Sequence, residues 1–588
     1  MLNKGLLFGG FSKYCRSQLR QYLRRYNGGQ GPPCKAAHAV KGVGVKPERA
    51  ANKEGGLMKN SFFILFASAA LLVSPLSAES WQILGPQALG MGGAFTAVAK
   101  GNLAQHWNPG GLGQEKNVSG FQMPIGGRFE FTGGLLGDAR NLSNIASRYE
   151  ALQSAQKSGG GMDTDKMAAF FQGVAALDSL NRPGKGALID MNAGVNIKIN
   201  KFVLSVNNYI SIGATPFVDT SNIGLGGVSG VPGSGVVISS ANVLAPVGSA
   251  AQQNAATAIA SAIGAGGYST ISQVICGSPT CLSANGIGDA AQLGNALVNV
   301  AVTAGASDSQ ITDAATAISL NAPVALPVLA IVASTSSYAN NASNLTLRGA
   351  SFTELALGFS KSLFLPGLAV GVNLKVIQGN VGYAKFQVLQ KEAGASNFYK
   401  DFTGVSKTSL QPGLDLGVYF DMNKTWDFLP MRPRVGAVGR NINRPKFDQP
   451  STAIAAGESS KYALDPQVRM GLALSPFNFW TLADDVDLTN NATAVPGFKS
   501  RMFNAGTEIN VFNRSWLNIP LRAGLMKNIA ASNSRVAYTA GAGFNFLHVI
   551  VDLGGSLSAE TESFKDDKGA TQKIPANASL AAQLAFLF

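Results

Sequence analysis

The second half of the chain is a succession of short segments in which apolar and polar residues alternate. A period of two is the pattern of a β-strand with one apolar and one polar face. From residue 352 onward, most of these segments have roughly the 9–11 residues that a tilted strand needs to span a bilayer. They are Phe352–Leu363, Leu368–Gln378, Gly382–Gln390, Leu410–Phe420, Arg432–Arg440, Pro466–Leu474, Trp480–Leu488, Arg501–Val511, Ile519–Lys527, Ala537–Phe546, His548–Leu557 and Ala578–Phe588. The pattern predicts an all-β membrane protein.

Three earlier segments have the same character: Phe121–Phe131, Ala187–Ile199 and Lys201–Gly213. They bring the total to fifteen, but single-chain bacterial barrels have an even number of strands. One of the fifteen is therefore superfluous, and we predict an antiparallel transmembrane β-barrel of about 14 strands.

The last predicted strand ends on an aromatic residue. Leu580, Ala582, Leu584, Phe586 and Phe588 share one of its faces. An alternating strand with a C-terminal aromatic residue resembles the strand by which outer-membrane barrels are recognised for insertion. We therefore expect outer-membrane lipid and, through Phe588, the barrel-assembly machinery as partners.

The composition fits a lipid-facing sheet better than a soluble enzyme. Hydrophobic residues make up 46% and charged residues only 14% of the chain, which also has 69 glycines. Residues 1–57 hold eleven Lys or Arg against two Glu, and Lys59 adds one more, so ten of the net +14 precede residue 60. The remaining +4 gives no reason to expect a nucleic acid as partner.

Residues 58–78 have the organisation of a secretory signal peptide. A basic start is followed by an apolar run, a proline and small residues before a cut after Ala78. Residues 1–57 are then best explained as a mis-called, non-native extension upstream of the true start at Met58. The alternative is a genuine basic extension or an organelle transit peptide.

Export also bears on the cysteines. Cys276 and Cys281 flank a short Ser-Pro turn, and an oxidising compartment favours a disulfide between them. A metal site is disfavoured because no His or second cysteine pair lies nearby. Cys15 and Cys34 lie in the extension.

Residues 79–118 concentrate turn-forming residues before the first strand. Glycine accommodates positive φ or close backbone approach, and Asn-Pro-Gly is a strong turn signal. The residues concerned are Gly90, Met91, Gly92, Gly93, Asn108, Pro109 and Gly110. The sequence GMGGA followed by WNPGGL resembles the start of the FadL-type outer-membrane channels. That resemblance implies an N-terminal hatch, or plug, inside the barrel, gated by these residues, and a small hydrophobic molecule as ligand.

The C-terminal half is most similar to the conjugal-transfer TraF-type subgroup of these barrels. The similarity is carried by TELALGFSKSL at Thr353–Leu363, QPGLDLGVYF at Gln411–Phe420, VGAVGRNIN at Val435–Asn443, LDPQVRMGLAL at Leu464–Leu474 and TLADDVDLTNN at Thr481–Asn491. It implies a role in an envelope apparatus as an alternative to transport.

Two stretches interrupt the strand pattern. Within residues 119–213, which hold the first barrel strands, residues 138–182 contain two segments with helical spacing. Residues 214–350 are rich in Ala, Gly and Ser and partly helical, and we expect a long insertion on the cell surface. Residues 351–588 form the remaining barrel strands.

Charged residues within the strands predict a networked lumen. Asp485 and Asp487 share one strand face, with Asp484 opposite, and Arg440 and Arg469 could pair with them, because membrane-depth charges face the interior. The alternative, a hard-cation site, lacks the spacing of a calcium loop.

Catalytic chemistry is not indicated. From Met58 onward the only histidines are His106, beside Trp107 in the plug, and His548 in a strand. No Ser–His spacing supports a phospholipase, so we expect neither an enzyme nor a cofactor. The two leading hypotheses are passive uptake of a small hydrophobic compound through a plugged barrel and a non-transporting scaffold of a conjugation, secretion or surface-attachment apparatus.

Overall fold

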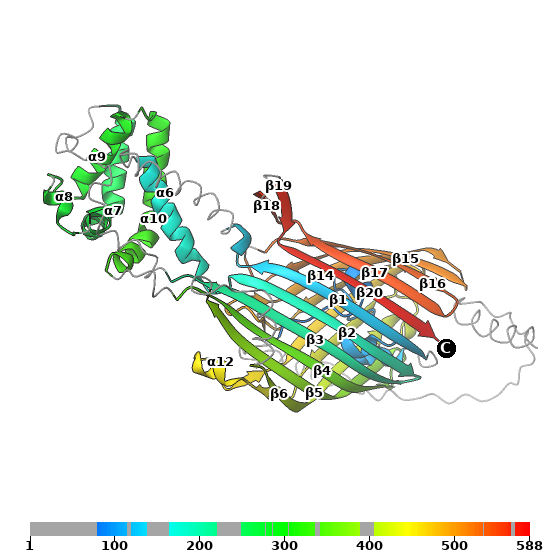
Figure 1. Ribbon diagram of the computed structural model, residues 1–588. Coiled ribbons are helices and arrows are strands. Elements are labelled where there is room, and N and C mark those ends of the chain that lie inside the picture. Colours follow the sequence, from blue (N-terminus) through cyan, green and yellow to red (C-terminus); the bar gives the residue numbers. More distant parts are fainter. Residues whose placement is uncertain are drawn as a thin grey trace, which may run out of the picture.

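The computed structural model describes residues 79–114, 119–137, 164–219, 248–276, 278–284, 286–303, 305–334, 342–387, 405–514, 516–532, 534–565 and 571–588. Fourteen strands form one closed antiparallel barrel in which each strand pairs with the next along the chain and β1 pairs with β20 (Figure 1). The barrel strands are β1 (Gly120–Thr132), β2 (Gly186–Ile199), β3 (Phe202–Phe217), β4 (Asn344–Ser362), β5 (Leu368–Gln387), β6 (Lys407–Asp421), β7 (Arg434–Arg440), β10 (Gln467–Phe477), β11 (Trp480–Asp487), β14 (Met502–Asn513), β15 (Leu517–Asn528), β16 (Ala537–Phe546), β17 (Val549–Ser558) and β20 (Asn577–Leu587).

The fifteen strands predicted from the sequence become fourteen because two of them are parts of one strand. Leu368–Gln378 and Gly382–Gln390 are parts of one strand, β5, because the glycines between them stay in the ladder. Gly379 pairs with Phe352, and Gly382 pairs with Gly349, both on the neighbouring strand β4. The prediction of about fourteen strands in an antiparallel barrel is confirmed.

The two ends of the barrel differ in their connections. At one end the turns are short, as at residues 200–201, 478–479 and 547–548. At the other end lie the long connections, which carry three small hairpins and one helix: β8 (Lys446–Asp448) with β9 (Lys461–Ala463), β12 (Asn491–Ala492) with β13 (Lys499–Ser500), β18 (Thr561–Lys565) with β19 (Thr571–Pro575), and α12 (Ser451–Ala455). Bacterial outer-membrane barrels place short turns in the periplasm and long loops outside the cell.

The outer wall carries the side chains expected next to lipid. Exposed Ile, Leu, Val and Met residues cover its middle, among them Ile125, Leu204, Leu374, Leu472 and Leu553. Aromatic residues gather at the short-turn end: Phe202, Phe359, Phe364, Phe420, Trp426, Phe428, Phe477, Phe479, Trp480, Phe512, Trp516, Phe544, Phe546, Phe586 and Phe588. An apolar band bounded by aromatic residues is the signature of a transmembrane barrel.

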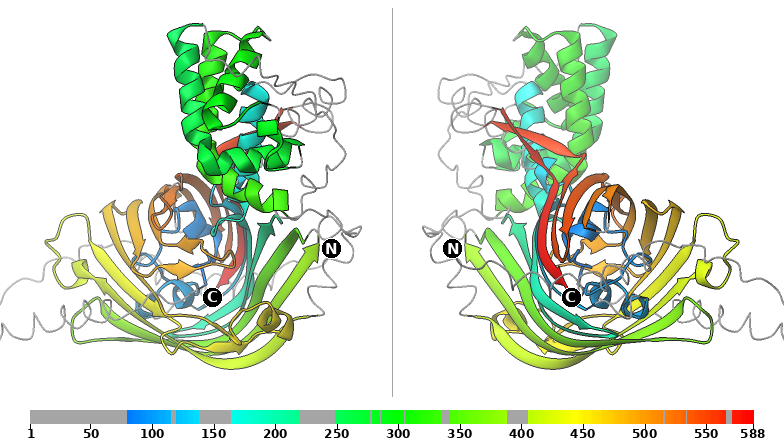
Figure 2. Two further views of the ribbon diagram at one scale, coloured as in Figure 1. Left: turned by 90° about the vertical axis from the view of Figure 1, so that its left-hand side faces the viewer. Right: turned by 90° about the vertical axis from the view of Figure 1, so that its right-hand side faces the viewer.

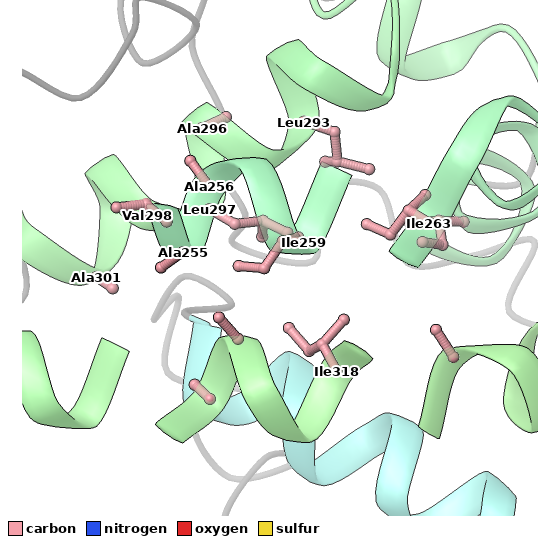
Figure 3. Close-up of a cluster of buried hydrophobic side chains, with 14 of the residues drawn as sticks. Ala255, Ala256, Ile259, Ile263, Leu293, Ala296, Leu297, Val298, Ala301 and Ile318 are labelled. Carbon is pink, nitrogen blue, oxygen red and sulfur yellow. The ribbon is translucent and has the colours of Figure 1, made fainter. Parts of the chain in front are cut away.

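A helical bundle stands beyond the long-loop end of the barrel (Figures 1 and 2). It consists of α6 (Thr164–Leu180), α7 (Ala250–Cys276), α8 (Cys281–Ala284), α9 (Ala290–Thr303) and α10 (Asp308–Ser334). Figure 3 shows its core, in which side chains such as Ile259, Leu297 and Ile318 are fully buried among alanines. The bundle therefore has a hydrophobic core of its own.

Helices α7–α10 of the bundle are inserted between β3 and β4, whose ends meet, whereas α6 belongs to the connection between β1 and β2. β3 runs on to Phe217 and β4 begins at Asn344, so the insertion is shorter at both ends than the predicted 214–350. The amide N of Asp219 donates to Ser343 Oγ at 2.9 Å, and the amide N of Ala342 donates to Asp219 Oδ2 at 2.9 Å. The insertion thus leaves and returns through one point of the barrel rim.

The helices in these regions follow the predicted ones in part. The predicted segment 165–180 is α6, whereas the one at 141–156 lies outside the described residues. Among the helices that the structure describes, none is long and apolar enough to cross a membrane.

Candidate functional site: the plug in the barrel lumen

Residues 79–114 fold back into the barrel and fill its lumen. Three short helices organise them: α3 (Pro86–Gly90), α4 (Ala104–Trp107) and the 3-10 helix η1 (Pro109–Gly113). Nearly every residue from Ser80 to Gly113 is buried, although the segment is too short to form a core alone. The plug is therefore held by what it contacts on the barrel wall.

The wall receives the plug on a ring of glycines that we call the glycine collar. It contains one glycine from each of eight strands, β5, β6, β7, β10, β14, β15, β16 and β17: Gly371, Gly417, Gly436, Gly471, Gly506, Gly524, Gly541 and Gly554. A Cβ atom at any of these positions would lie 2.2–3.0 Å from a plug atom. The plug thus rests directly on the wall backbone.

Strand register places the collar at one level of the barrel. Four pairs of collar glycines stand directly opposite each other on neighbouring strands: Gly371 with Gly417, Gly436 with Gly471, Gly506 with Gly524, and Gly541 with Gly554. The collar was not predicted from the sequence. Its only sequence signal is a lumen-facing glycine repeated in successive strands.

The plug glycines predicted from the sequence meet the collar. Gly92 and Gly93 have φ of +68° and +84°, a region that side chains rarely adopt. A Cβ on Gly92 would lie 2.5 Å from the carbonyl O of Leu525, and a Cβ on Gly110 would lie 2.8 Å from the amide N of Tyr419. Close backbone approach explains why small residues are needed here.

One carboxylate of the wall binds the plug backbone. Asp485 on β11, the strand between β10 and β14 that lacks a collar glycine, accepts hydrogen bonds from the plug. The donors are the amide N of Phe95 at 3.0 Å, the amide N of Thr96 at 2.9 Å and Thr96 Oγ1 at 2.7 Å. Buried donors are costly to leave without an acceptor, so Asp485 fastens the plug between the collar glycines of β10 and β14.

Asn108 links two turns of the plug to the wall. Its Oδ1 accepts from the amide N of Gly110 at 3.0 Å, which caps η1. Its Nδ2 donates to the carbonyl O of Thr96 at 3.2 Å and to the carbonyl O of Val418 on β6 at 2.9 Å. The predicted turn at residues 108–110 is thus an anchoring point in this structure.

The aromatic residues of the plug lie beneath two arginines of the wall. The guanidinium carbon of Arg469 lies 4.5 Å from the ring centroid of Trp81, and that of Arg440 lies 5.2 Å from it. Trp107 is fully buried, and its Nε1 donates to the carbonyl O of Leu84 at 2.9 Å. Desolvated cation–π contacts contribute about 2 kcal/mol each. The two arginines therefore stabilise the bound plug in addition to forming ion pairs with acidic residues of the wall.

His106 is held in its neutral form. Its Nε2 lies 3.1 Å from the carbonyl O of Gln82, which can only accept, so Nε2 carries the proton and Nδ1 accepts from Tyr209 Oη at 2.8 Å. Burial, followed by the positive charge of Arg440, holds the pKa of His106 well below its usual value. His106 therefore contributes packing and hydrogen bonds, not charge.

The lumen wall contains a network of buried ion pairs. The distances are 2.6 Å for Arg469 Nε to Asp487 Oδ1, 2.9 Å for Lys375 Nζ to Asp415 Oδ1, 3.2 Å for Lys375 Nζ to Glu354 Oε1, 3.5 Å for Arg440 Nη2 to Glu354 Oε2, 2.7 Å for Arg522 Nη1 to Asp552 Oδ1 and 2.7 Å for Arg522 Nε to Glu508 Oε2. Buried charges persist when they are paired in this way. The lumen is therefore charged and cross-linked by salt bridges.

The predicted lumen residues divide as follows. Asp485, Asp487, Arg440 and Arg469 are all buried inside the barrel. Asp485 binds the plug backbone, Asp487 pairs with Arg469, and both arginines combine an ion pair with a contact to Trp81 of the plug. Asp484 lies on the opposite face of β11 and is exposed.

The predicted disulfide between Cys276 and Cys281 lies partly outside the described residues. Cys281 is disulfide-bonded, but the side chain of Cys276 lies outside the described residues, so their pairing remains a prediction. Within the described ranges, no group of three or more His, Cys, Asp or Glu side chains could hold a metal ion.

The described cavities within the lumen are small. One of about 50 Å³ lies near the long-loop end beside Arg128 and Glu130, and another of about 30 Å³ lies between Trp81 of the plug and β1. A larger apolar groove of about 690 Å³ lies on the wall over β16, β17, β20, β1 and β2, where exposed residues such as Leu580 and Tyr538 line it. It shares residues 127, 128, 190, 579 and 580 with the 30 Å³ cavity behind it.

Together, the closed barrel, its lipid-compatible outer wall and the seated plug define a plugged membrane-spanning β-barrel. Among solved structures, the chain resembles the toluene transporter TbuX of Ralstonia pickettii, with 9% identity over 86% of this chain and 98% of that one and a TM-score of 0.36. It also resembles the toluene transporter TodX of P. putida (9%, 85% and 97%, 0.37) and a FadL homologue of Pseudomonas aeruginosa (8%, 87% and 99%, 0.35). No curated protein sequence matches the chain.

A family profile goes further than these similarities. The profile described as "F plasmid transfer operon, TraF, protein" matches residues 106–487, well over half of the chain, from plug helix α4 to strand β11. The chain therefore belongs to this TraF family, which agrees with the similarity noted in its C-terminal half.

Proposed function

We propose that this protein is an outer-membrane anchor: a barrel sealed by a fixed plug that holds the helical bundle outside the cell as a scaffold for an envelope apparatus. The observation that carries the proposal is the glycine collar. The plug rests on the backbone of eight strands, and its van der Waals contacts with all of them would be lost together if the plug moved. Such a plug is suited to closing the barrel and bracing it.

The character of the lumen supports the same function. Between the plug and the wall, the cavity of about 30 Å³ beside Trp81 has room for only a few water molecules. A hydrophobic compound crossing the lumen would have to pass buried ion pairs such as Arg469–Asp487, which favour water or each other over an apolar cargo.

The bundle supplies the part of the anchor that contacts partners. It has its own core, and the two connections of α7–α10 meet at Asp219 and Ser343, while α6 joins the core from the connection between β1 and β2. Its position at the long-loop end corresponds to the outside of the cell in a bacterial outer membrane.

The second candidate function is passive uptake of a small hydrophobic compound, gated by the plug at residues 90–93 and 108–110. The observation that favours it is the apolar groove on the wall, which shares lining residues of β1, β2 and β20 with the cavity beside Trp81. Toluene, named for two of the similar structures, is a suitable test compound.

A disulfide lock separates the two functions. A Cβ on Gly113 would lie 3.6 Å from Ser360 Cβ, within the range for a disulfide, so a Gly113→Cys/Ser360→Cys variant joins η1 to β4. If the protein is an anchor, toluene uptake by cells is the same for the oxidised lock, the reduced lock and the wild type. Uptake that falls on oxidation and returns on reduction would support transport instead.

The anchor function has its own test. Replacing residues 220–341 by a short Gly-Ser linker reconnects Asp219 to Ala342, which already touch. We expect the shortened barrel to reach the outer membrane but to lose the envelope proteins that cross-link to the wild type. Unchanged cross-linking by the shortened barrel would contradict the proposal.

A further inference from the structure

The plug begins at Glu79, on the side of the lumen that faces the long loops. Tyr462 of β9, in the long connection between β7 and β10, donates a hydrogen bond to Glu79 Oε2. Gln467, the first residue of β10, donates through its Nε2 to the carbonyl O of Glu79. The other end of the plug lies at the short turns, where Gln114 Nε2 donates to the carbonyl O of Gly367 at 3.0 Å. The plug therefore runs from the long-loop side of the lumen to the short-turn side.

The side chain of Glu79 is an acid without a cation. Its Oε1 is buried and has no hydrogen-bond partner. Among the residues that the structure describes, no Lys, Arg or His forms an ion pair with it. Burial, together with the negative charge of Asp190, raises the pKa of Glu79 to about 7. This site therefore requires either a proton on Glu79 or a cation next to it.

The acid nearest to Glu79 already has its own cation. Asp190 Oδ2 on β2 lies 2.6 Å from Arg128 Nη2 on β1, and Asp190 Oδ1 accepts from Ser211 Oγ on β3 at 2.8 Å. Arg128 is also shared with Glu130, whose Oε2 lies 3.4 Å from Arg128 Nη1. Arg128 thus faces two carboxylates on the wall and leaves Glu79 unpaired.

The other charged groups around the start of the plug are paired as well. Asp465, in the turn between β9 and β10, forms an ion pair with Arg444. The two wall arginines over the plug aromatic residues pair with acids of the wall. From Glu79 to Ala99 the plug chain contains no Lys and no Arg. A cation for Glu79 must therefore come from a group other than these side chains.

Processing of the chain creates such a cation. Hydrolysis of the peptide bond after Ala78, at the cut predicted from the sequence, consumes one water molecule and leaves a carboxylate on Ala78 and an α-amino group on Glu79. An α-amino group has an ordinary pKa of about 7.7–8.0 and is mostly protonated at neutral pH. Its nitrogen is four bonds from the carboxyl carbon of the same residue, which keeps the two groups within about 5 Å of each other. An amide nitrogen at the same place carries no charge.

We propose that removal of the signal peptide completes this site: the α-ammonium group of Glu79 forms an ion pair with its own carboxylate, next to Asp190, and fastens the long-loop end of the plug. Opposite charges within about 4–6 Å stabilise each other's charged form. A precursor with its signal peptide still attached lacks this cation, so cleavage precedes firm seating of the plug. The proposal concerns the plug alone and holds whether or not the barrel transports.

The test measures the α-amino group of the mature protein, produced from Met58 in a Gram-negative bacterium and purified in a non-ionic detergent. N-terminal sequencing identifies the first residue. The pH dependence of labelling by an amine-reactive ester, read by mass spectrometry of the N-terminal peptide, gives the pKa of the α-amino group. We expect the chain to begin at Glu79 and this pKa to be about 9 or higher. In Glu79→Ala the pKa should return most of the way to its ordinary value, whereas Asp448→Ala, which removes an exposed carboxylate from the hairpin of Tyr462, should leave it unchanged.

An insertion variant tests the effect on the plug. Inserting Gly-Ser between Ala78 and Glu79 keeps the positive charge but moves it two residues away from the carboxylate. Hydrogen–deuterium exchange at the amides of residues 81–85 should then be roughly tenfold faster than in the wild type, the factor that corresponds to one pKa unit. Heat-modifiable migration on a gel shows that each variant has a folded barrel.

Four results would overturn the proposal. The first is a mature chain that begins at another residue. The second is an α-amino pKa at or below its ordinary value, which indicates an amine without an anionic partner. The third is the same α-amino pKa in Glu79→Ala and the wild type. The fourth is wild-type exchange of the plug amides in the insertion variant.

Discussion

The glycine collar makes a prediction that two adjacent residues of one strand can test. Gly554 faces the plug, and a Cβ there would lie 2.6 Å from the carbonyl O of Pro86 and 3.3 Å from the amide N of Gly90. Its neighbour Gly555 has only ordinary contacts, 3.4 Å to the carbonyl O of Ser579 and 3.9 Å to Leu580. Gly554→Ala and Gly555→Ala therefore make the same chemical change in the same strand, one against the plug and one away from it.

The expected magnitude follows from overpacking. Placing a methyl group against backbone that cannot retreat costs about 1–3 kcal/mol, whereas Gly→Ala without a clash stabilises by about 0.4–1 kcal/mol through the unfolded state. Gly554→Ala should thus loosen the seat of the plug by roughly 1–2 kcal/mol, about a 5- to 30-fold increase in its open population. Gly555→Ala should leave the seat unchanged.

The assay is hydrogen–deuterium exchange of the purified barrel, read at the amides of residues 88–94. When local opening is fast, exchange reports the free energy of that opening. We expect faster exchange of these amides in Gly554→Ala and wild-type exchange in Gly555→Ala, with both barrels intact by heat-modifiable migration. Equal exchange in the two variants would refute the reasoning that the collar holds the plug.

Three further predictions concern the polar contacts of the plug and the lumen. Asp485→Ala leaves the donors of Phe95 and Thr96 without their acceptor and should weaken the seat by about 3 kcal/mol, measured as faster hydrogen–deuterium exchange of the plug amides. The control Asp484→Ala, on the outer face, should not change this exchange. Equal effects of the two variants would contradict this assignment. The lowered pKa of His106 stabilises the seat above pH 6.5, and this contribution is lost as pH falls. The free energy of unfolding, measured by urea titration, should therefore drop below pH 6.5 by up to about 1.4 kcal/mol per pH unit; a His106→Gln variant with the same slope would count against it. Arg469→Ala should destabilise the barrel by about 3–5 kcal/mol, because it leaves the buried Asp487 without its ion-pair partner. The double variant Arg469→Met/Asp487→Leu should recover much of this loss, as measured by thermal unfolding. No recovery would argue against an uncompensated charge as the cause.

The barrel could be predicted from the sequence because each strand has one face toward lipid and one toward the lumen, so that apolar and polar residues alternate along it. β6 shows this well: Leu416 faces out and is exposed, whereas Asp415 beside it is buried in the lumen. Strand ends were less predictable. β5 continues through Gly379 and Gly382, which look like a turn locally but are retained by pairing with β4.

The site was only half predictable. Gly92, Asn108 and Asp485 stood out because turn chemistry and membrane-depth charge are local signals. The collar glycines carry no such signal singly, since each is one glycine in a strand, and their common role depends on a register that only the closed barrel fixes.

The composition of the inserted bundle has a practical consequence. From Phe202 to Leu347 the chain contains no lysine and no arginine. Trypsin, which cuts after those residues, can therefore leave this whole stretch intact on living cells, folded or unfolded. A surface-shaving experiment with trypsin would release no peptide from within this stretch, which holds α7–α10, whereas chymotrypsin, which can cut at its tyrosines and leucines, would reveal it.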